Sequence, residues 1–492
     1  MSVESRRLFG RRKILIDDTE ITSQNVLEVL QKTLQIHYLN SDEINYLYNY
    51  RKGNQPILYR EKDIRPEVNN KVVENHADEI TSFKVAYLLH NRVQYVASEK
   101  DSAKSADIIK LNRWENSEKK TTNDISVMNW AHVGGVGIRM VLPDSMANVE
   151  ADEAPFEQYS LDPRFAYVVY SNSLGEPPVM GVKYVMRSDG VVVYSVYTAD
   201  RYYEIGYSPD TGHQVIRNEV NPLGMVPMVE YPMTDRMGCF EKVIPLLDAL
   251  NLTASDRENG IEQFVQALLL FHNVDIPKDD FEKLRDLGGL KYADLDNQHP
   301  GDVKYLIAEL KQTETQVLVD WEYQVILNIC GMPNRNGTSH STSDTGAATI
   351  VRDGWFDAEA KAKDTESLFR DSEMEYLKIV LKICDVMGGL NLTVGDIEVK
   401  MPRRVYENLQ AKAQVLTTLL SNPKVAPRRA YIVSDLFPDP EEACEEGMKY
   451  YEESMKQSLL AAQNTDVKQQ GQDDNGTDGK EDKTDTGNGG KD

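Results

Sequence analysis

Apolar residues in the first quarter of the chain recur every three or four positions, a spacing that predicts helices packed along one side. Residues 22–23 can cap a first helix, a second is predicted from Ser41 to Gly53, and a third from about Asn69. The stripes of the first and third helices are Leu27, Leu30 and Leu34, and Val73, His76, Ile80, Phe83 and Tyr87.

Between residues 155 and 231 the period shortens and turn residues become frequent. Short β-rich runs alternate with Gly-, Pro-, Asn- and Asp-containing turns, which predicts consecutive antiparallel strands in a meander. The predicted runs are Phe165–Tyr170, Val179–Met186, Val191–Thr198, Arg201–Tyr207 and His213–Val220.

After Pro232 the helical period returns. A long helix is predicted from Pro245 to about Val274, although the polar stretch 251–259 breaks its apolar stripe. After a segment rich in Gly and Pro, a further helix is predicted to end at Gly331. Its stripe is Leu318, Trp321, Val325 and Ile329, and we expect this stripe to be buried.

The last third of the chain begins with the polar stretch 334–346. A long helix is predicted from Ala347 to Met387, roughly 60 Å if unbroken. A strand near residues 397–401 and helices at 407–420 and 428–455 follow. From Gln463 onward the chain contains almost nothing apolar, which predicts a disordered tail.

Charge and cysteine content restrict the classes of function. The formal net charge is −24, which argues against a protein that grips DNA by neutralising phosphates but permits an acidic channel. The four cysteines are far apart and form no CxxC pair, so neither a zinc site nor a disulfide framework is indicated. No signal peptide or membrane span is recognisable, and we expect a soluble, intracellular protein.

No motif in the sequence carries enzyme chemistry. There is no GxxxxGK[ST] phosphate loop, and Asp320 at the end of an apolar run is better explained as the edge of an amphipathic helix. The cluster 134–137 lacks GxGxxG order and indicates close backbone packing. The Gly337–Ser341 stretch fails the GxSxG pattern, and the loop from Asp294 fails the calcium pattern. We therefore expect no catalytic residues, no metal and no cofactor, and a hydrogen-bonded core role for His76.

Several stretches, in order, resemble the portal proteins of long-tailed double-stranded-DNA bacteriophages, especially the group common in phages of Gram-positive bacteria. The resemblance covers about residues 20–455 and rests on several moderate matches. The stretches are Asn69–Leu88 with Val93–Tyr95, Phe240–Phe264, Ser343–Ala348 with the helix beyond, Asp396–Lys400, and the helices ending near Asp439–Glu442. Two departures, Pro245 at the start of a helix and Met401–Arg404 after the strand, affect local boundaries.

The resemblance implies an α+β, mainly helical portal fold with an antiparallel β-rich wing, long stem and tunnel helices, and a helical crown. The implied order is a basic N-terminal segment (1–19), wing (20–235), first stem helix (236–274), clip (275–310), second stem helix (311–331), tunnel loop (332–346), long wing or tunnel helix (347–389), return strand (390–405), helical crown (406–460) and disordered acidic tail (461–492).

The resemblance also implies a function. Portal subunits form a homo-oligomeric ring, twelve in the phage particle, at one capsid vertex, and the genome is packaged and ejected through the channel. The implied partners are double-stranded DNA, the terminase large subunit, the head–tail adaptor, and the major capsid and scaffolding proteins. The implied location is the virion, after assembly in the host cytoplasm, with no membrane.

The polar stretch is the candidate DNA contact, because hydroxyls and amides can touch phosphates without long dwell. The candidate residues are Arg335, Asn336, Thr338, Ser339, His340, Ser341, Thr342 and Ser343. The alternative for this stretch is a solvated surface loop. For the whole chain, the alternatives are a packaging-associated nucleic-acid enzyme and a helical scaffold or adaptor without a channel.

Overall fold

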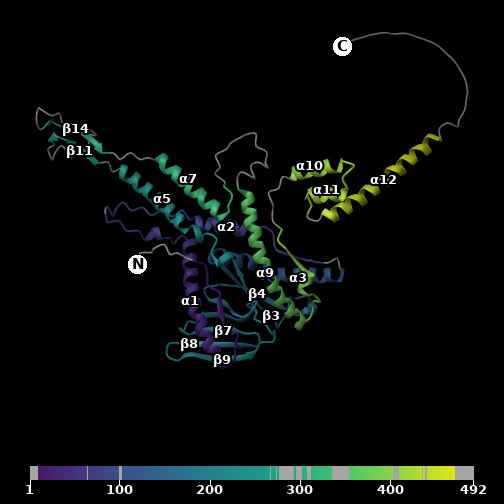
Figure 1. Cartoon of the computed structure of the whole chain (residues 1–492), viewed down its shortest axis with the longest axis horizontal. Coiled ribbons are helices and arrows are strands. Elements are labelled where there is room, and N and C mark those ends of the chain that lie inside the picture. Colours follow the sequence, from purple (N-terminus) through teal and green to yellow (C-terminus); the bar gives the residue numbers. More distant parts are fainter. Residues whose placement is uncertain are drawn as a thin grey trace, which may run out of the picture. The chain divides into compact units, whose positions relative to one another are not determined.

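A six-stranded sheet forms the β-rich part of the chain in the computed structural model (Figure 1). β5 (Ala166–Ser171), β6 (Pro178–Met186), β7 (Val192–Tyr197), β8 (Arg201–Ser208) and β9 (Gly212–Val220) pair antiparallel in sequence order. The predicted meander is therefore confirmed. β1 (Ile14–Ile16) adds to β5 in parallel at one edge.

The described part of the chain falls into two units. The described residues are 9–63, 65–98, 102–265, 268–272, 274–275, 293–294, 302–306, 312–334, 354–402, 409–434, 436–437 and 440–470. The larger unit comprises residues 1–344 and 348–405, and the smaller comprises 345–347 and 406–492. Helices and antiparallel sheets coexist, which confirms the α+β class.

A second sheet has β3 (Val136–Pro143) at its centre, between β10 (Met228–Pro232) and β4 (Phe156–Leu161). The glycine cluster before β3 does serve close packing. A Cβ added to Gly135 would overlap the carbonyl oxygen of Arg236, and one added to Gly137 would overlap that of Val127. The strand itself was not predicted, because its apolar run does not alternate.

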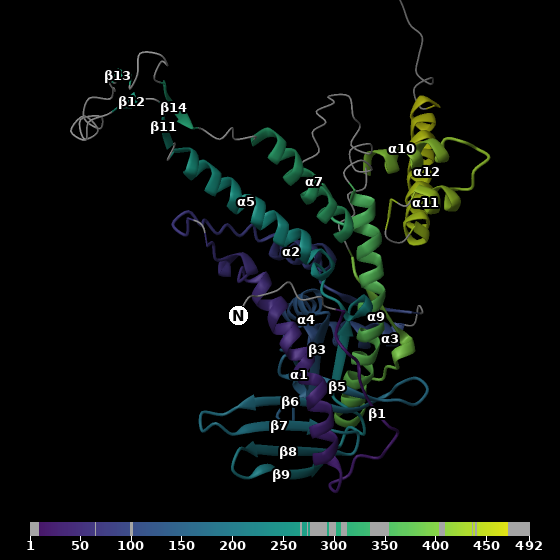
Figure 2. The same cartoon turned by 60° about the vertical axis from the view of Figure 1, so that its left-hand side comes forward.

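α1 (Val26–Arg51) is one continuous helix, so the prediction of separate helices divided at Ser41 is wrong. The Ser41 hydroxyl caps no helix and donates instead to the carbonyl of Arg164, 3.0 Å away. Leu30 and Leu34 of α1 pack on the six-stranded sheet, whose strands lie behind the helix in Figure 2. Ile44 and Leu47, beyond the polar middle of the helix, are buried as well, so the buried face continues across it.

α2 (His76–Leu88) begins later than predicted, because the preceding residues bond to another helix. The backbone N–H groups of residues 70, 72 and 74 donate to the side chains of Asn259, Ser255 and Asn251 over 2.7, 2.9 and 2.8 Å. These three side chains belong to α5 (Ile244–Val265) and are buried. The polar break in the α5 stripe is therefore a row of hydrogen-bonding groups.

α5 ends at Val265, short of the predicted Val274. The apolar run after it forms β11 (Leu268–His272), which pairs antiparallel with β14 (Asp302–Leu306). β12 (Val274–Asp275) and β13 (Ala293–Asp294) form a further pair. A short run of large apolar residues fits either helix or strand, and periodicity alone does not separate the two.

The remaining elements of the larger unit include its longest helix. α9 (Trp355–Met387) has 33 residues and spans about 50 Å. β15 (Ile397–Lys400) pairs antiparallel with β2 (Gln94–Ala97), which confirms the predicted strand near 397–401. The other segments are α3 (Ser102–Ser117), α4 (Lys120–Gly134), α7 (Gln312–Cys330), and the short 3-10 helices η1 (Pro56–Tyr59), η2 (Val149–Ala151), η3 (Thr234–Arg236), η4 (Glu241–Val243) and η5 (Val394–Asp396).

The smaller unit contains α10 (Leu409–Leu420), α11 (Pro427–Ser434) and α12 (Pro440–Gln470). The single helix predicted at 428–455 is therefore two helices. Pro440 begins α12, where its missing N–H needs no partner. α12 also continues past Gln463, the predicted start of the tail, and residues 471–492 lie outside the described residues.

Four buried charged side chains, which we call the ionic cluster, fix α9 to the rest of the larger unit. Lys120 and Asp124 come from α4, Arg139 from β3 and Glu373 from α9, and each is at most 4% exposed. The Lys120 ammonium lies 2.6 Å from Glu373 and 2.7 Å from Asp124, and Arg139 pairs with both carboxylates. The positive charges of Lys120 and Arg139 are thereby balanced by carboxylates, although both side chains are shielded from water.

Tyrosines complete the ionic cluster. The hydroxyls of Tyr95 and Tyr231 donate to the Glu373 carboxylate over 2.5 and 2.7 Å. Burial by itself would raise the pKa of Glu373, but Lys120, Arg139 and these hydrogen bonds hold that pKa below its ordinary value. The Arg139 guanidinium also lies 4.7 Å from the ring centre of Tyr376. The carboxylate is therefore ionised and nearly saturated with donors.

We expect Arg139→Met to destabilise the protein by about 3–5 kcal/mol, because it leaves two buried carboxylates with one cation. Urea unfolding measures the change. Arg370→Met is the matched control, since the exposed Arg370 side chain pairs with Glu366 on the surface of α9 and its removal should cost less than about 1 kcal/mol. Equal losses in both variants would contradict a special role for the ionic cluster.

Candidate functional site at the base of a polar loop

The candidate DNA-contacting residues, Arg335 to Ser343, all lie outside the described residues, as does the whole stretch 335–353. The described chain stops at Asn334 and resumes at Gly354. These two ends are adjacent, because a Cβ added to Gly354 would lie 3.7 Å from the Met332 carbonyl oxygen and 3.9 Å from the Pro333 Cα. The chain therefore departs and returns at one point, the loop base (residues 332–334 and 354–355).

Aromatic packing from α2 holds the returning end of the loop base. The Trp355 ring lies 6.2 Å from the rings of Phe83 and Tyr87, which stack on each other at 5.6 Å. The Tyr87 hydroxyl donates to Glu359 over 2.9 Å. Phe83 and Tyr87 belong to the predicted α2 stripe, and the structure gives them the start of α9 as a partner. The helix after the polar stretch is thus fixed at its first turn.

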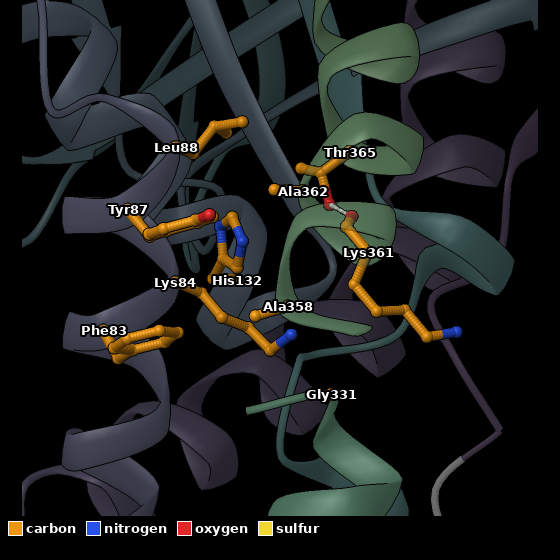
Figure 3. Close-up of a pocket in the computed structure, with 10 residues that line it drawn as sticks. All are labelled: Phe83, Lys84, Tyr87, Leu88, His132, Gly331, Ala358, Lys361, Ala362 and Thr365. Atoms are coloured by element: carbon orange, nitrogen blue, oxygen red, sulfur yellow. Dashed lines mark hydrogen bonds between the residues drawn. The ribbon is translucent and has the colours of Figure 1, made fainter. Parts of the chain in front are cut away.

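A small cleft lies beside the loop base (Figure 3). The residues that line it come from α2, α4, the end of α7 and α9, and are Phe83, Lys84, Tyr87, Leu88, His132, Gly331, Ala358, Lys361, Ala362 and Thr365. Gly331, Ala358 and Ala362 are small, so the helices approach closely there. The side chain of Lys361 extends away from the α2 residues in Figure 3.

His132 is the buried titratable group of this cleft. Its Nδ1–H donates to the carbonyl of Met128 over 2.8 Å, and burial lowers the pKa of His132 to about 4. The imidazole is therefore neutral at physiological pH, and the nearby Lys84 also disfavours its charged form. Over the described ranges, no His, Cys, Asp and Glu groups gather as a metal site. We therefore interpret the cleft as a junction at which helices pack together.

A second histidine clamps α2 to α7. The two ring nitrogens of His76 lie 2.8 Å from Glu79 and 3.2 Å from Glu74, and the Tyr323 hydroxyl of α7 donates to Glu79 over 3.0 Å. Burial alone would lower the pKa of His76, but the two carboxylates raise it to about 9. His76 is hydrogen-bonded as expected, but it is half-buried and charged rather than part of the core.

α7 carries two apolar faces, and the predicted stripe is the exposed one. Ile326, Leu327 and Cys330 are buried against α5 and its surroundings. In contrast, Leu318, Trp321 and Ile329 are 46%, 58% and 49% exposed. The expectation that this stripe is buried is wrong for the single chain. Periodicity located the stripe correctly but could not show which of two apolar faces packs internally.

The Asp320 carboxylate is exposed on α7 and accepts a hydrogen bond from the Gln316 side chain over 2.7 Å. This geometry agrees with the helix-edge interpretation.

Across the part of the chain that the structure describes, no helix combines the length and apolar character needed to cross a membrane.

Comparison with known proteins places most of the chain in one family model. The model described as "Phage portal protein, SPP1 Gp6-like" matches residues 30–458, which extend through the larger unit and into α12. A solved structure titled "Neck of empty GTA particle computed with C6 symmetry" is similar with 10% sequence identity. That match covers 74% of this chain and 90% of the other, with a TM-score of 0.41. No curated protein matches the chain.

We expect the free energy of unfolding to fall as the pH rises through the range in which His76 loses its proton. The pKa of His76 is raised from 6.5 to about 9 in the folded protein, so its stabilisation is complete below pH 6.5 and lost by about pH 9. His76→Gln should flatten this part of a melting-temperature profile. Gln31→Ala, which removes the partner of the half-buried His213, should leave the slope unchanged. An unchanged slope in His76→Gln would contradict the clamp.

Proposed function

Because the chain belongs to the SPP1 Gp6-like family of phage portal proteins, we propose that it is the subunit of a ring at one capsid vertex. Double-stranded DNA passes through the channel of this ring during genome packaging and ejection. The family match over residues 30–458 carries the proposal. Portal proteins are structural, and on this proposal the subunit supplies a conduit and docking surfaces.

The second apolar face of α7 supports self-assembly. A helix that is apolar around most of its circumference is normally buried on both sides. In the single chain, Trp321 and its neighbours Val317 and Leu318 remain largely exposed, although the opposite face packs internally. α5 and α7 run side by side (Figure 2), so a copy of this pair can cover the exposed face of the next. A ring repeats this contact at every subunit.

The net charge suits a conduit. Each chain carries −24, so twelve copies would carry −288. Like charge prevents DNA from adhering to a wall, and steady contact is then left to a few polar groups. In this proposal, Arg335 and the hydroxyl and amide side chains that follow it touch the duplex transiently. The two ends of their stretch meet at the loop base, as a protruding loop requires.

The proposed partners follow from the place of the ring. The terminase large subunit docks during filling and a head–tail adaptor replaces it afterwards, while the capsid and scaffolding proteins surround the ring. Negative-stain imaging of the purified protein tests the central claim. A ring with a central hole supports the proposal, whereas only monomers or solid particles over a wide concentration range would oppose it.

We expect Trp321→Glu to impair assembly while preserving the fold. A tryptophan at the centre of an interface is commonly worth about 2 kcal/mol or more, so assembly should require over tenfold higher protein concentration. Light scattering coupled to size exclusion measures this shift, and thermal melting of the monomer controls for folding. Gln324→Glu adds the same charge to an exposed polar position of α7 and should assemble normally. Equal assembly by both variants would remove α7 from the interface.

We expect Arg335→Glu to leave ring formation and melting intact but to reduce the DNA packaged or retained. The reason is the loss of a cation that steadies the duplex against an acidic wall, a contact that weakens as salt rises. Arg65→Glu, far from the stretch in sequence, makes the matched charge change. Normal packaging and retention by Arg335→Glu would remove the DNA-contact role and leave the portal assignment in place.

A further inference from the structure

Glu115 of α3 is a buried carboxyl group beside the ionic cluster, and no cation among the described residues lies within ion-pair distance of it. The residue is 2% exposed. Its oxygens accept hydrogen bonds from the Tyr376 hydroxyl, at 2.8 and 3.0 Å, and from the Gln158 amide, at 2.8 Å. It therefore joins α3 to α9 and β4 through neutral partners alone.

The charges of the ionic cluster balance without Glu115. Lys120 and Arg139 supply two positive charges, and Asp124 and Glu373 supply two negative charges. An ionised Glu115 would be a fifth, uncompensated charge in a region closed to water. An isolated buried carboxylate costs several kcal/mol, and such a group commonly takes up a proton instead.

We propose that Glu115 is a neutral carboxylic acid in the folded protein, and that its ionisation loosens the contact of α9 with α3 and β4. Only a proton moves in this step, from the carboxyl oxygen to solvent. The group is a pH-sensitive latch on the longest helix, and its role does not depend on ring formation.

The surroundings of Glu115 agree with this state. Burial raises the pKa of Glu115 to about 7, against the lowering effects of Lys120 and Tyr376. The titratable and charged groups that face it from the neighbouring elements are Lys120 and Asp124 of α4, Arg139 of β3, Tyr95 of β2, and Glu373, Tyr376 and Cys384 of α9.

The direction of the pH effect follows from the raised value. The unfolded chain releases this proton near pH 4.5, whereas the folded chain retains it to about pH 7. Stability from Glu115 is therefore fully present below pH 4.5 and is lost as pH rises through about 7. The His76 effect operates from pH 6.5 to about 9, so it continues after the Glu115 effect has ended.

Glu115→Gln tests the latch, because the amide keeps the shape and cannot ionise. Its melting temperature relative to wild type should rise progressively between pH 4.5 and 7 and stay level above that range. Glu375→Gln removes an exposed carboxylate of α9, next in sequence to Tyr376, and its profile should run parallel to that of wild type. Parallel profiles for Glu115→Gln and wild type would overturn the proposal.

Infrared spectroscopy of the wild-type protein gives a second readout that requires no folded variant. A protonated carboxyl group absorbs above the amide bands, and isotope labelling of glutamate identifies the residue type. We expect such a band at pH 6 that disappears as pH rises through about 7. Its absence at pH 6 would show that Glu115 is ionised and would end the proposal, whatever the assembly state of the protein.

Discussion

The carboxylate of Glu373 is the group on which the larger unit depends. It receives hydrogen bonds or ion pairs from Lys120 of α4, Arg139 of β3, Tyr95 of β2 and Tyr231 of β10. These elements come from three separate stretches of the chain, and α9 follows all of them in sequence. The carboxylate can lose its water only when its donors are already assembled. Correct placement of α9 therefore requires that α4, β2 and the sheet containing β3 and β10 are already in place.

The middle and the first turn of α9 are held by different kinds of contact. Its middle is fixed by buried charge, whereas its first turn is held by aromatic rings from α2 and leads directly from the loop base. The α5–α7 pair joins the same region through the His76 clamp and also presents an apolar face to solvent. In a ring, a force applied to that face by a neighbouring copy would reach the loop base through α2. The exposed apolar face of α7 and the loop base are thus linked through α2 within one chain.

The sequence predicted correctly those strands whose residues alternate or are separated by turn residues. The meander was placed correctly because polar turns separate its runs, and the strand at 397–401 was found for the same reason. The continuity of the helices was harder to predict. The polar middle of α1 is compatible with a helix or with a break, and the apolar run at Leu268 is compatible with a helix or with a strand, until their packing partners are known. The ionic cluster was missed altogether, because Lys120 and Arg139 look in sequence like surface charges. Nor could periodicity choose between the two faces of α7, because each is apolar. The predicted DNA-contacting residues remain a prediction.

The side chains of Asn251, Ser255 and Asn259 lie on a helix, yet they bind the extended segment 70–74 in the way that a neighbouring strand would. Residues four apart on a helix are about 6 Å apart along its axis, and alternate residues of an extended chain are about 6.7 Å apart. The two repeats stay in step for the three hydrogen bonds at residues 70–74, but they would drift apart over a longer row. A single inserted residue would turn the next N–H away and leave a buried side chain without its donor. The length of this irregular segment is therefore as strictly fixed as the register of a strand in a sheet.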